Sequence, residues 1–450
     1  MDLILAADFL SNATVSVCVV DLRDGTTVYE KNPDLVLNPA SNVKLVTTAA
    51  ALQVLGPEHR FATRALADPK QLRNGTLHGP LYLQGSGDPA LVTGELFELA
   101  TRLRAAGLTE LMGAIVIDNT RFDHDGLPPG YDQKDEFASY RAPGGAASIN
   151  FNTYQLVARP GPRVGSKTRA TTLPAIAGIQ IINEGTTTEG RRKRLTVRVD
   201  RTQDLTTITL GGSMGVDASP AHYRYPIQDP SDYTGEVFRM VLRQAGITVG
   251  SKTIKTGATP DSAKTLATHR SDPVSVQIRA INKLSNNFMA EQLLRTLARN
   301  EGATAKDALD VLRAFTRAIE MPQNGLQLGN GSGLYDNNRM SAAQLTHLLT
   351  VMHRDFRYRS DFVASLAVAG TEGTLRKRLK SSSARRWIRG KTGTLNGISA
   401  LSGYAGAEGG SLYAFSILFN DLDRWETGTA RKTQNRIAEQ LATEAARRAK

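Results

Sequence analysis

The distribution of short apolar runs along the chain constrains its fold more than any other feature of the sequence. From about Thr63 to Thr268, strand-like runs such as LYLQ, AIVI and LTTITL are separated by Gly, Asp, Asn and Pro. A hairpin pattern around Asp24-Gly25 and an apolar helix precede this stretch, and helical periodicity returns after His269. Two strand-like runs, ISALSGYAG and LYAFSILFN, then precede a last amphipathic helix from about Lys432 to Arg448. This order predicts an α/β (α+β) domain that is split by a long β-rich insertion.

The length of the chain also indicates several domains, because 450 residues exceed what a single hydrophobic core ordinarily organises. We expect an α/β domain from residues 1–62 and 269–450, and an inserted β-rich domain from residues 63–160 and 216–268. Residues 161–215 are rich in Thr, Gly and basic residues, which predicts a separate small β subdomain within the insert.

The composition, with 40% apolar and 22% charged residues, is typical of a globular protein. A formal charge of +12 would suit nucleic acid or an anionic polymer, but a solvated basic surface is the simpler interpretation. No zinc-finger spacing or aromatic-interleaved basic stretch supports nucleic-acid binding. No apolar run approaches the ~20 residues that a transmembrane helix needs. We therefore expect neither a nucleic-acid partner nor a transmembrane segment.

The stretch NPASNVKLVTTAAALQVLG places Ser41 and Lys44 three positions apart at the expected start of a helix. A serine at such a position is most often a helix cap. However, Lys44 lies one turn further on the same face, and a lysine shielded from water can lose its proton and act as a base. The helix N-terminus also offers backbone N–H groups to a developing oxyanion. Ser41 is therefore either a cap or a nucleophile, and one S-x-x-K match is expected by chance in a chain of this length.

Two further motifs follow in the chain. Ser285-Asn286-Asn287 stands at the head of an amphipathic helix, and Lys391-Thr392-Gly393 leads into an apolar alternating stretch, which predicts a strand that begins after the motif. Residues 255–257 also spell K-T-G, but they precede the S-x-N motif and so break the order; residues 148–150 also spell S-x-N, but no helical pattern follows them. The ordered set S-x-x-K, S-x-N and K-T-G is typical of penicillin-interacting serine enzymes.

With these motifs the sequence resembles the class C low-molecular-mass penicillin-binding proteins, the D-alanyl-D-alanine carboxypeptidase/endopeptidase family. The resemblance covers nearly the whole chain and includes the stretches QGSGDPAL, GAIVIDNTRFD, YRAPGGAASINFN, GSGL and LAVAGTEGTLRKR. The interval of about 240 residues between Ser41 and Ser285 matches the inserted domains of this family. The resemblance implies a serine transpeptidase/β-lactamase-like domain with β-rich domains inserted between the first two motifs.

The resemblance also implies a role for each motif residue in acyl transfer. Ser41 would attack the carbonyl carbon of the D-Ala-D-Ala bond, with Lys44 as general base. The backbone N–H groups of Ser41 and Thr394 would form the oxyanion hole. Ser285 would relay a proton to the leaving amine, and Asn287 would hold Lys44 and the substrate amide. The resemblance implies no metal or cofactor.

The third motif would bind the end of the substrate. Lys391 and Thr392, with Gly393 between them and Thr394, would receive the terminal carboxylate of the peptide, which explains a cationic residue at this position. The implied partners are peptidoglycan stem peptides and cross-links, with β-lactams as covalent inhibitors.

Two positions concern the side chain of the substrate. Counting back from Ala142-Pro143, Asp135 matches the family's acidic residue that meets the free amine of the peptidoglycan diamino acid; the alternative is a solvated loop residue. The family's usual G-S-G-L-S-R motif is here G-S-G-L-Y-D, so Tyr335 and Asp336 replace the usual serine and arginine. Arg339 is a candidate substitute for the arginine, and the preferred stem peptide or cross-link is open.

We expect a serine DD-carboxypeptidase that also cuts D-Ala-to-diamino-acid cross-links. The alternatives are a β-lactamase on the same core, against which the long insert argues, and a catalytically inactive peptidoglycan-binding scaffold, against which the intact motifs argue. The start, MDLILAADFL, lacks the basic region of a signal peptide. Since the substrate lies outside the cytoplasmic membrane, the resemblance implies a periplasmic protein whose leader is missing from this sequence.

Overall fold

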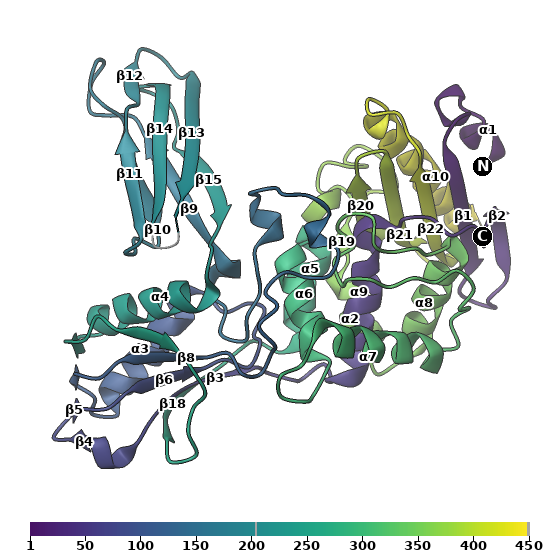
Figure 1. Cartoon of the computed structure of the whole chain (residues 1–450). Coiled ribbons are helices and arrows are strands. Elements are labelled where there is room, and N and C mark those ends of the chain that lie inside the picture. The colour runs from purple at the N-terminus through teal and green to yellow at the C-terminus, as the bar shows by residue number, and fades with distance from the viewer. Residues whose placement is uncertain (203–204, 448–450) are drawn as a thin grey trace. The chain divides into compact units, whose positions relative to one another are not determined.

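The structure is a computed structural model that describes residues 1–202 and 205–447. The chain forms two compact units, and each unit is assembled from separate segments of the sequence (Figure 1). Unit 1 comprises residues 1–61, 121–135 and 270–450, and unit 2 comprises residues 62–120 and 136–269.

Unit 1 is built on a six-stranded antiparallel sheet of order β19-β20-β21-β22-β1-β2. The predicted hairpin around Asp24-Gly25 is present as β1 paired with β2, and β1 also pairs with β22, so the two ends of the chain share one sheet. The strands are β1 (Thr14–Asp21), β2 (Thr27–Lys31), β19 (Ala367–Val368), β20 (Ile388–Leu395), β21 (Ile398–Gly406) and β22 (Leu412–Asn420).

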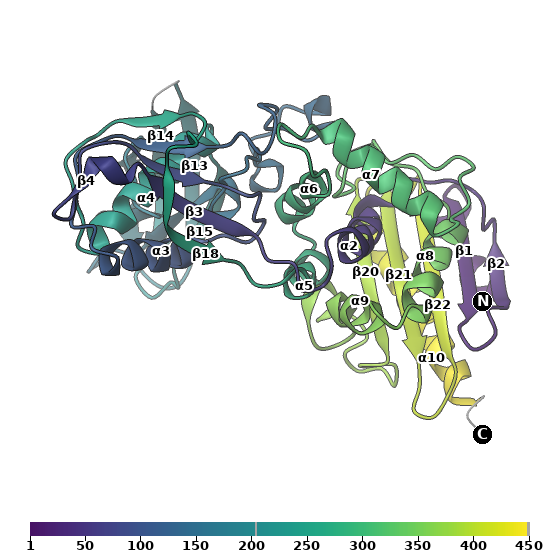
Figure 2. The ribbon, with the colours of Figure 1, turned by 90° about the horizontal axis from the view of Figure 1, so that it is seen from below.

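Helices cover both faces of this sheet, and all the helices of unit 1 except α1 are labelled in Figure 2. They are α1 (Asp2–Leu5), α2 (Val43–Val54), α5 (Val274–Leu284), α6 (Asn287–Thr296), α7 (Ala305–Ala318), α8 (Ala342–Arg354), α9 (Arg359–Ser365) and α10 (Thr427–Arg447). The S-x-N motif stands at the head of α6, as the sequence pattern predicted, and the chain turns there between α5 and α6. The predicted end of the last helix, Arg448, lies outside the described residues.

The alternation of side chains along β22 assigns the two faces. Phe415 and Ile417 belong to the same buried cluster as Ile437 of α10, so this face packs on the last helix. Ser416, on the opposite face, hydrogen-bonds to Ser402 of β21, whose hydroxyl accepts a 2.9 Å hydrogen bond from Asn42 at the start of α2. The sheet therefore separates α10 from α2, and the α2 face is the one that carries polar side chains.

Helix α2 is buried along its length, from Val43 to Leu52. Such burial explains why its sequence is apolar all round rather than amphipathic. Lys44 is the charged residue among these buried positions, and its side chain is as buried as those of its apolar neighbours. A buried charged group must be compensated by nearby polar groups, which marks the start of α2 as a candidate functional position.

Residues 121–135 pack in unit 1, whereas the sequence boundaries assign them to the inserted domain. Phe122 forms a β-bridge with Ala303, and Asp123 is ion-paired with Arg295 of α6. These partners are more than 170 residues apart in sequence, so local periodicity carries no signal for them.

Unit 2 contains a five-stranded sheet, a smaller four-stranded sheet and two long helices. The strands of the first are β3 (Ala62–Ala67), β6 (Leu81–Gln84), β8 (Ile115–Asp118), β17 (Ile254–Thr256) and β18 (Lys264–Arg270); those of the second are β4 (Leu72–Arg73), β5 (Thr76–Leu77), β7 (Glu110–Leu111) and β16 (Thr248–Val249). Helices α3 (Thr93–Ala105) and α4 (Pro230–Gln244) share a core with the first sheet. The sequence pattern did not predict these two helices.

The described residues of unit 2 also form two further sheets. Their strands are β9 (Thr153–Arg159), β10 (Arg169–Leu173) and β15 (Ala221–Pro226) in one, and β11 (Ile179–Asn183), β12 (Thr186–Thr188), β13 (Lys193–Arg201) and β14 (Thr206–Gly215) in the other. Leu210 and Met214 of β14 share a small core with Ala158 and Ala221. The predicted β subdomain, residues 161–215, thus packs on strands that flank it in sequence.

Over the described ranges, no helix combines the length and the apolar character that crossing a membrane requires.

Candidate active site

The first motif lies where a short 3-10 turn, residues 40–42, leads into α2. Ser41 is in the turn and Lys44 in the first turn of α2, and their Oγ and Nζ atoms are 3.0 Å apart. No side-chain capping bond is present at the N-terminus of α2. Ala40 has φ +47°, and a side chain on Gly333 would come within 1.9 Å of the Ala40 carbonyl oxygen, so the glycine permits a close approach.

The Lys44 ammonium group is enclosed by oxygen acceptors. Besides Ser41, Nζ donates to Asn287 Oδ1 at 2.7 Å and to the carbonyl oxygen of Ser332 at 2.6 Å. Burial lowers the pKa of Lys44 to about 7, although the negative charge of Glu291 acts in the opposite direction. A substantial fraction of Lys44 is therefore neutral near pH 7, which is the state in which an amine can accept a proton.

Glu291 holds the loop that supplies one of these acceptors. Its buried carboxylate accepts hydrogen bonds from the backbone N–H of Gly331 at 3.1 Å and of Ser332 at 2.8 Å. Tyr131 OH, also buried, lies 2.8 Å from Ser332 Oγ. Burial raises the pKa of Glu291, while its hydrogen bonds and Lys44 oppose that shift. Glu291 thereby fixes the carbonyl that Lys44 contacts.

Sequence reasoning missed Glu291 and Tyr131. The signal for Glu291 was available, because it stands four residues after Asn287 and so shares a face of α6 with it. Tyr131 had no comparable signal, since only the tertiary structure brings residues 121–135 to Ser332.

The second and third motifs meet through their polar side chains. Lys391 Nζ of β20 donates to Ser285 Oγ at 2.8 Å and to the carbonyl oxygen of Thr392 at 2.7 Å. Ser285 occupies the turn between α5 and α6 with φ +60°, and Asn286 caps α6 through the N–H of Met289. Burial holds the pKa of Lys391 well below its ordinary value, and the charge of Lys44 adds to the effect.

Strand β20 passes directly beside the turn that carries Ser41. A Cβ atom on Gly393 would lie 2.8 Å from the Pro39 carbonyl oxygen and 3.1 Å from Ala40 Cβ, so this contact requires glycine. The K-T-G sequence thus lies within a strand and not before one, and its glycine allows the first and third motifs to approach. S-x-x-K, S-x-N and K-T-G are brought together in one unit.

The side chains of the two threonines of the third motif have different partners from the side chain of Lys391. The Thr392 hydroxyl donates to Thr374 Oγ1 at 2.9 Å, and Thr394 Oγ1 accepts a hydrogen bond from Arg431 of α10 at 3.2 Å. Since side chains alternate along a strand, Thr392 and Thr394 lie on the face opposite Lys391 and Gly393.

The positions expected to contact the side chain of the substrate differ in their surroundings. Asp135 is exposed and belongs to unit 1, the unit that holds the three motifs. Asp336 accepts a hydrogen bond from Asn38 at 3.0 Å and forms an ion pair with Arg339 at 2.6 Å. These contacts lower the pKa of Asp336, with the Arg339 hydrogen bond as the main cause. The charge of Arg339 is therefore largely neutralised by Asp336.

The decoy motifs lie in unit 2. Residues 255–257 fall on and just after β17, and Ser148 donates a hydrogen bond to the Gly145 carbonyl oxygen at 2.7 Å, as buried structural serines do. Asn152 also donates to Ser148 Oγ at 2.9 Å. Neither stretch shares a unit with Ser41.

The sequence model of the D-Ala-D-Ala carboxypeptidase 3 (S13) family matches residues 1–442. The chain belongs to this family. It is 32% identical over 433 residues to the D-alanyl-D-alanine carboxypeptidase of Actinomadura sp. (strain R39), covering 93% of this chain and 80% of that one. It is 24% identical over 418 residues to D-alanyl-D-alanine carboxypeptidase DacB of Haemophilus influenzae, covering 91% and 85% of the two chains.

Solved structures show the same fold. The crystal structure of penicillin-binding protein 4 from Haemophilus influenzae aligns with a TM-score of 0.80 at 21% identity, covering 97% of this chain and 99% of that one. A predatory peptidoglycan endopeptidase from Bdellovibrio bacteriovorus aligns with a TM-score of 0.58 at 16% identity, covering 96% and 93%. The comparisons confirm three predictions: the fold class, the class C penicillin-binding protein family and a serine D-Ala-D-Ala carboxypeptidase.

Proposed function

We propose that Ser41 is the nucleophile of this carboxypeptidase and that Lys44 is its general base. The observation that carries this proposal is the set of contacts around Lys44 Nζ. Two of its three neighbours, Asn287 Oδ1 and the Ser332 carbonyl oxygen, can only accept hydrogen bonds. In the neutral amine they take both N–H groups, so the lone pair is directed to the third neighbour, the Ser41 hydroxyl, 3.0 Å away.

The reaction follows from this arrangement. Lys44 takes the hydroxyl proton as Ser41 Oγ forms a bond to the carbonyl carbon of the substrate, and the backbone N–H groups of Ser41 and Thr394 stabilise the oxyanion. The C–N bond to the terminal D-Ala then breaks, and Ser285 passes a proton to the leaving amine. Water hydrolyses the acyl-enzyme ester and regenerates Ser41.

Lys391 serves two roles in this scheme. Its contact with Ser285 Oγ positions the proton relay, and the arriving carboxylate of the substrate favours the protonated form of Lys391, which then binds that carboxylate. Thr392, Gly393 and Thr394 bind the same end of the peptide through the edge of β20. Asp135 is proposed to meet the free amine of the diamino acid, since it is an exposed carboxylate in the unit that holds the motifs.

We propose peptidoglycan stem peptides as the substrate and β-lactams as covalent inhibitors. Support comes from the relatives named D-alanyl-D-alanine carboxypeptidases and from a similar structure, penicillin-binding protein 4, solved with a β-lactam. The similar structure of a peptidoglycan endopeptidase supports cleavage of cross-links as a second activity. Such substrates place the enzyme outside the cytoplasmic membrane.

Mass spectrometry of the intact protein after incubation with benzylpenicillin tests the nucleophile. Opening the β-lactam ring expels no atoms, so we expect one adduct with the full mass of the drug. Ser41→Ala should abolish the adduct, and Ser381→Ala, which changes an exposed serine outside the motifs, should retain it. Persistence of the adduct in Ser41→Ala would refute the assignment. Hydrolysed drug without a lasting adduct would favour the β-lactamase, and intact drug with unmodified protein would favour the inactive scaffold.

A further inference from the structure

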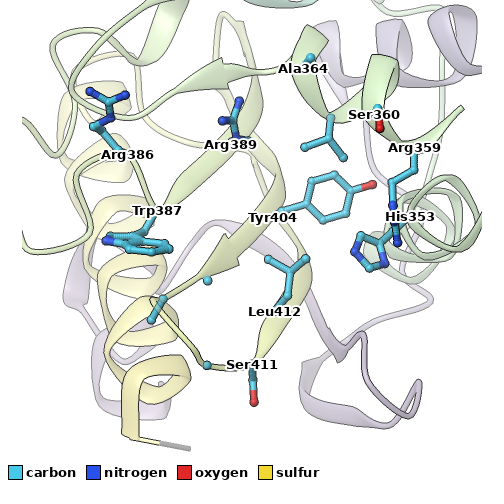
Figure 3. A pocket seen from close by; sticks show the side chains of 14 residues that line it. His353, Arg359, Ser360, Ala364, Arg386, Trp387, Arg389, Tyr404, Ser411 and Leu412 are labelled. Carbon is cyan, nitrogen blue, oxygen red and sulfur yellow. The ribbon is translucent and has the colours of Figure 1, made fainter. Parts of the chain in front are cut away.

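A cavity of about 610 Å³ lies in unit 1 among the C-terminal end of α8, helix α9 and the ends of strands β20, β21 and β22 (Figure 3). None of the motif residues lines it. Arg389 lies two positions before Lys391 on β20, so both side chains are on the α2 face, but Arg389 opens into this cavity. The volume is within the ~300–1,000 Å³ that small-molecule sites occupy.

The charge of the cavity wall is entirely of one sign. Arg359, Arg386 and Arg389 line it together with His353, and none of its lining residues is acidic. Within the described part of the chain, none of the three guanidinium groups has an acidic partner, although Arg359 contacts the Phe356 ring at 5.7 Å. The neighbouring Arg357, outside the cavity, is by contrast ion-paired with Asp355 at 2.7 Å. Arginine remains charged at all ordinary pH values, so these groups form an uncompensated positive site.

The remaining wall is apolar and aromatic. Figure 3 shows Trp387 and Arg386 on one side, Arg359 and His353 on the other, and Arg389 and Tyr404 between them. Tyr404 is buried and directs its hydroxyl to the Leu349 carbonyl oxygen, so it contributes mainly its ring. Trp387 is 42% exposed, which is unusual for so large an apolar side chain beside a cavity. The wall thus offers guanidinium groups for an oxyanion and apolar surface for the group that carries it.

We propose that this cavity is a second binding site, separate from the serine site, for a small organic anion in which a carboxylate or phosphate group adjoins an apolar portion. Guanidinium groups bind both oxyanions through paired N–H groups. Two sources share this chemistry: the free carboxylate of a peptide and the phosphate ester of an anionic polymer. The proposal does not depend on the catalytic roles assigned above.

The two tryptophans of the chain allow a direct measurement. Trp425 is 88% exposed and does not line the cavity, so Trp425→Phe leaves Trp387 as the single fluorescent tryptophan. In this background we would titrate N-acetyl-leucine against its uncharged amide, and butyl phosphate against butanol. We expect a saturable change in Trp387 fluorescence with at least one anion and none with the two neutral compounds. The anion that saturates identifies the source.

Charge variants then locate the binding. Arg359→Gln and Arg389→Gln should each raise the dissociation constant at least about tenfold, because each removes a charged hydrogen-bond donor. Arg436→Gln, an exposed arginine of α10 outside the cavity, should leave it unchanged, and so should Lys391→Gln in the serine site. Arg359→Lys retains the charge and shows whether the paired donors matter, and thermal melting identifies any variant that fails to fold.

The proposal is wrong if neither anion saturates the signal at concentrations up to about 20 mM, far weaker than the affinities typical of specific sites. It is also wrong if Arg436→Gln weakens binding as much as Arg359→Gln, since the effect would then reflect net charge. Loss of binding in Lys391→Gln, with Arg359→Gln unaffected, would assign the anion to the serine site instead.

Discussion

Lys391 and Arg389 lie two positions apart on the same face of strand β20, yet their surroundings differ completely. Lys391 is buried, donates to Ser285 and Thr392, and has a pKa well below its ordinary value because of burial. Arg389 lines a cavity that holds two further arginines and no acidic residue. The comparison teaches that two cations on one sheet face can differ in burial and in partners, and that these surroundings decide which chemistry is open to each.

The largest effect is expected when the serine site, to which Lys391 belongs, loses its proposed base, Lys44. Lys44→Arg keeps the positive charge but cannot become neutral, so the acylation rate with benzylpenicillin should fall by ~10²–10⁴. Stopped-flow or quenched mass spectrometry measures the rate. Lys432→Arg, an exposed position on α10, serves as the control. An acylation rate within a factor of about two of wild type would exclude Lys44 as the base.

A smaller effect is expected when β20 is displaced from the turn that carries Ser41. In Gly393→Ala the new methyl group would lie 2.8 Å from the Pro39 carbonyl oxygen, so the strand must shift. We expect acylation to be slower by ~10–100-fold and the free energy of unfolding to fall by about 1–3 kcal/mol. Gly428→Ala, with no atom within 4 Å, should retain the wild-type rate and change stability by at most about 1 kcal/mol. Equal behaviour of the two variants would show that the close approach is unimportant.

The pH dependence of acylation tests the electrostatic coupling to Glu291. As the proposed base, Lys44 must be neutral to act, and burial lowers its pKa to about 7, so the rate should rise with pH through about 7. The charge of Glu291 raises the pKa of Lys44; Glu291→Gln removes that charge, and the rising limb should therefore move to lower pH. Asp310→Asn, an exposed residue of α7, should leave the limb in place. If the rise of the acylation rate with pH is unchanged or moves to higher pH in Glu291→Gln, the result would contradict the coupling.

The smallest effect is expected when the cavity that Arg389 lines loses one of its other arginines. Arg359→Gln should leave the acylation rate within about twofold of wild type and the stability within about 0.5 kcal/mol, because its guanidinium group forms no ion pair with any described residue. The same assays measure both quantities. A slowing comparable to that of Lys44→Arg would show that the cavity and the serine site function as one, and the distinction between Lys391 and Arg389 would fail.

The sequence by itself determined the family and, with it, the chemistry that we propose for the serine site. The ordered motifs at Ser41, Ser285 and Lys391 predicted the family and the fold class, because acyl transfer requires particular side chains at particular spacings. Local patterns also predicted the first hairpin and the return of helices after His269, because both depend on residues that are close together in the sequence. The same patterns failed for α3 and α4, and for β20, where the K-T-G sequence lies within the strand.

Only the tertiary structure decided which groups surround those side chains. It brings Glu291 to the loop that contacts Lys44, places Tyr131 against Ser332, and brings Arg389 and Arg359 into the lining of one cavity that has no acidic lining residue. These contacts join residues far apart in the chain, and their burial depends on the packing of whole helices on the sheet. The pKa of a group, and whether its charge is paired, depend on this three-dimensional environment. The spacing of residues in the sequence therefore cannot predict them.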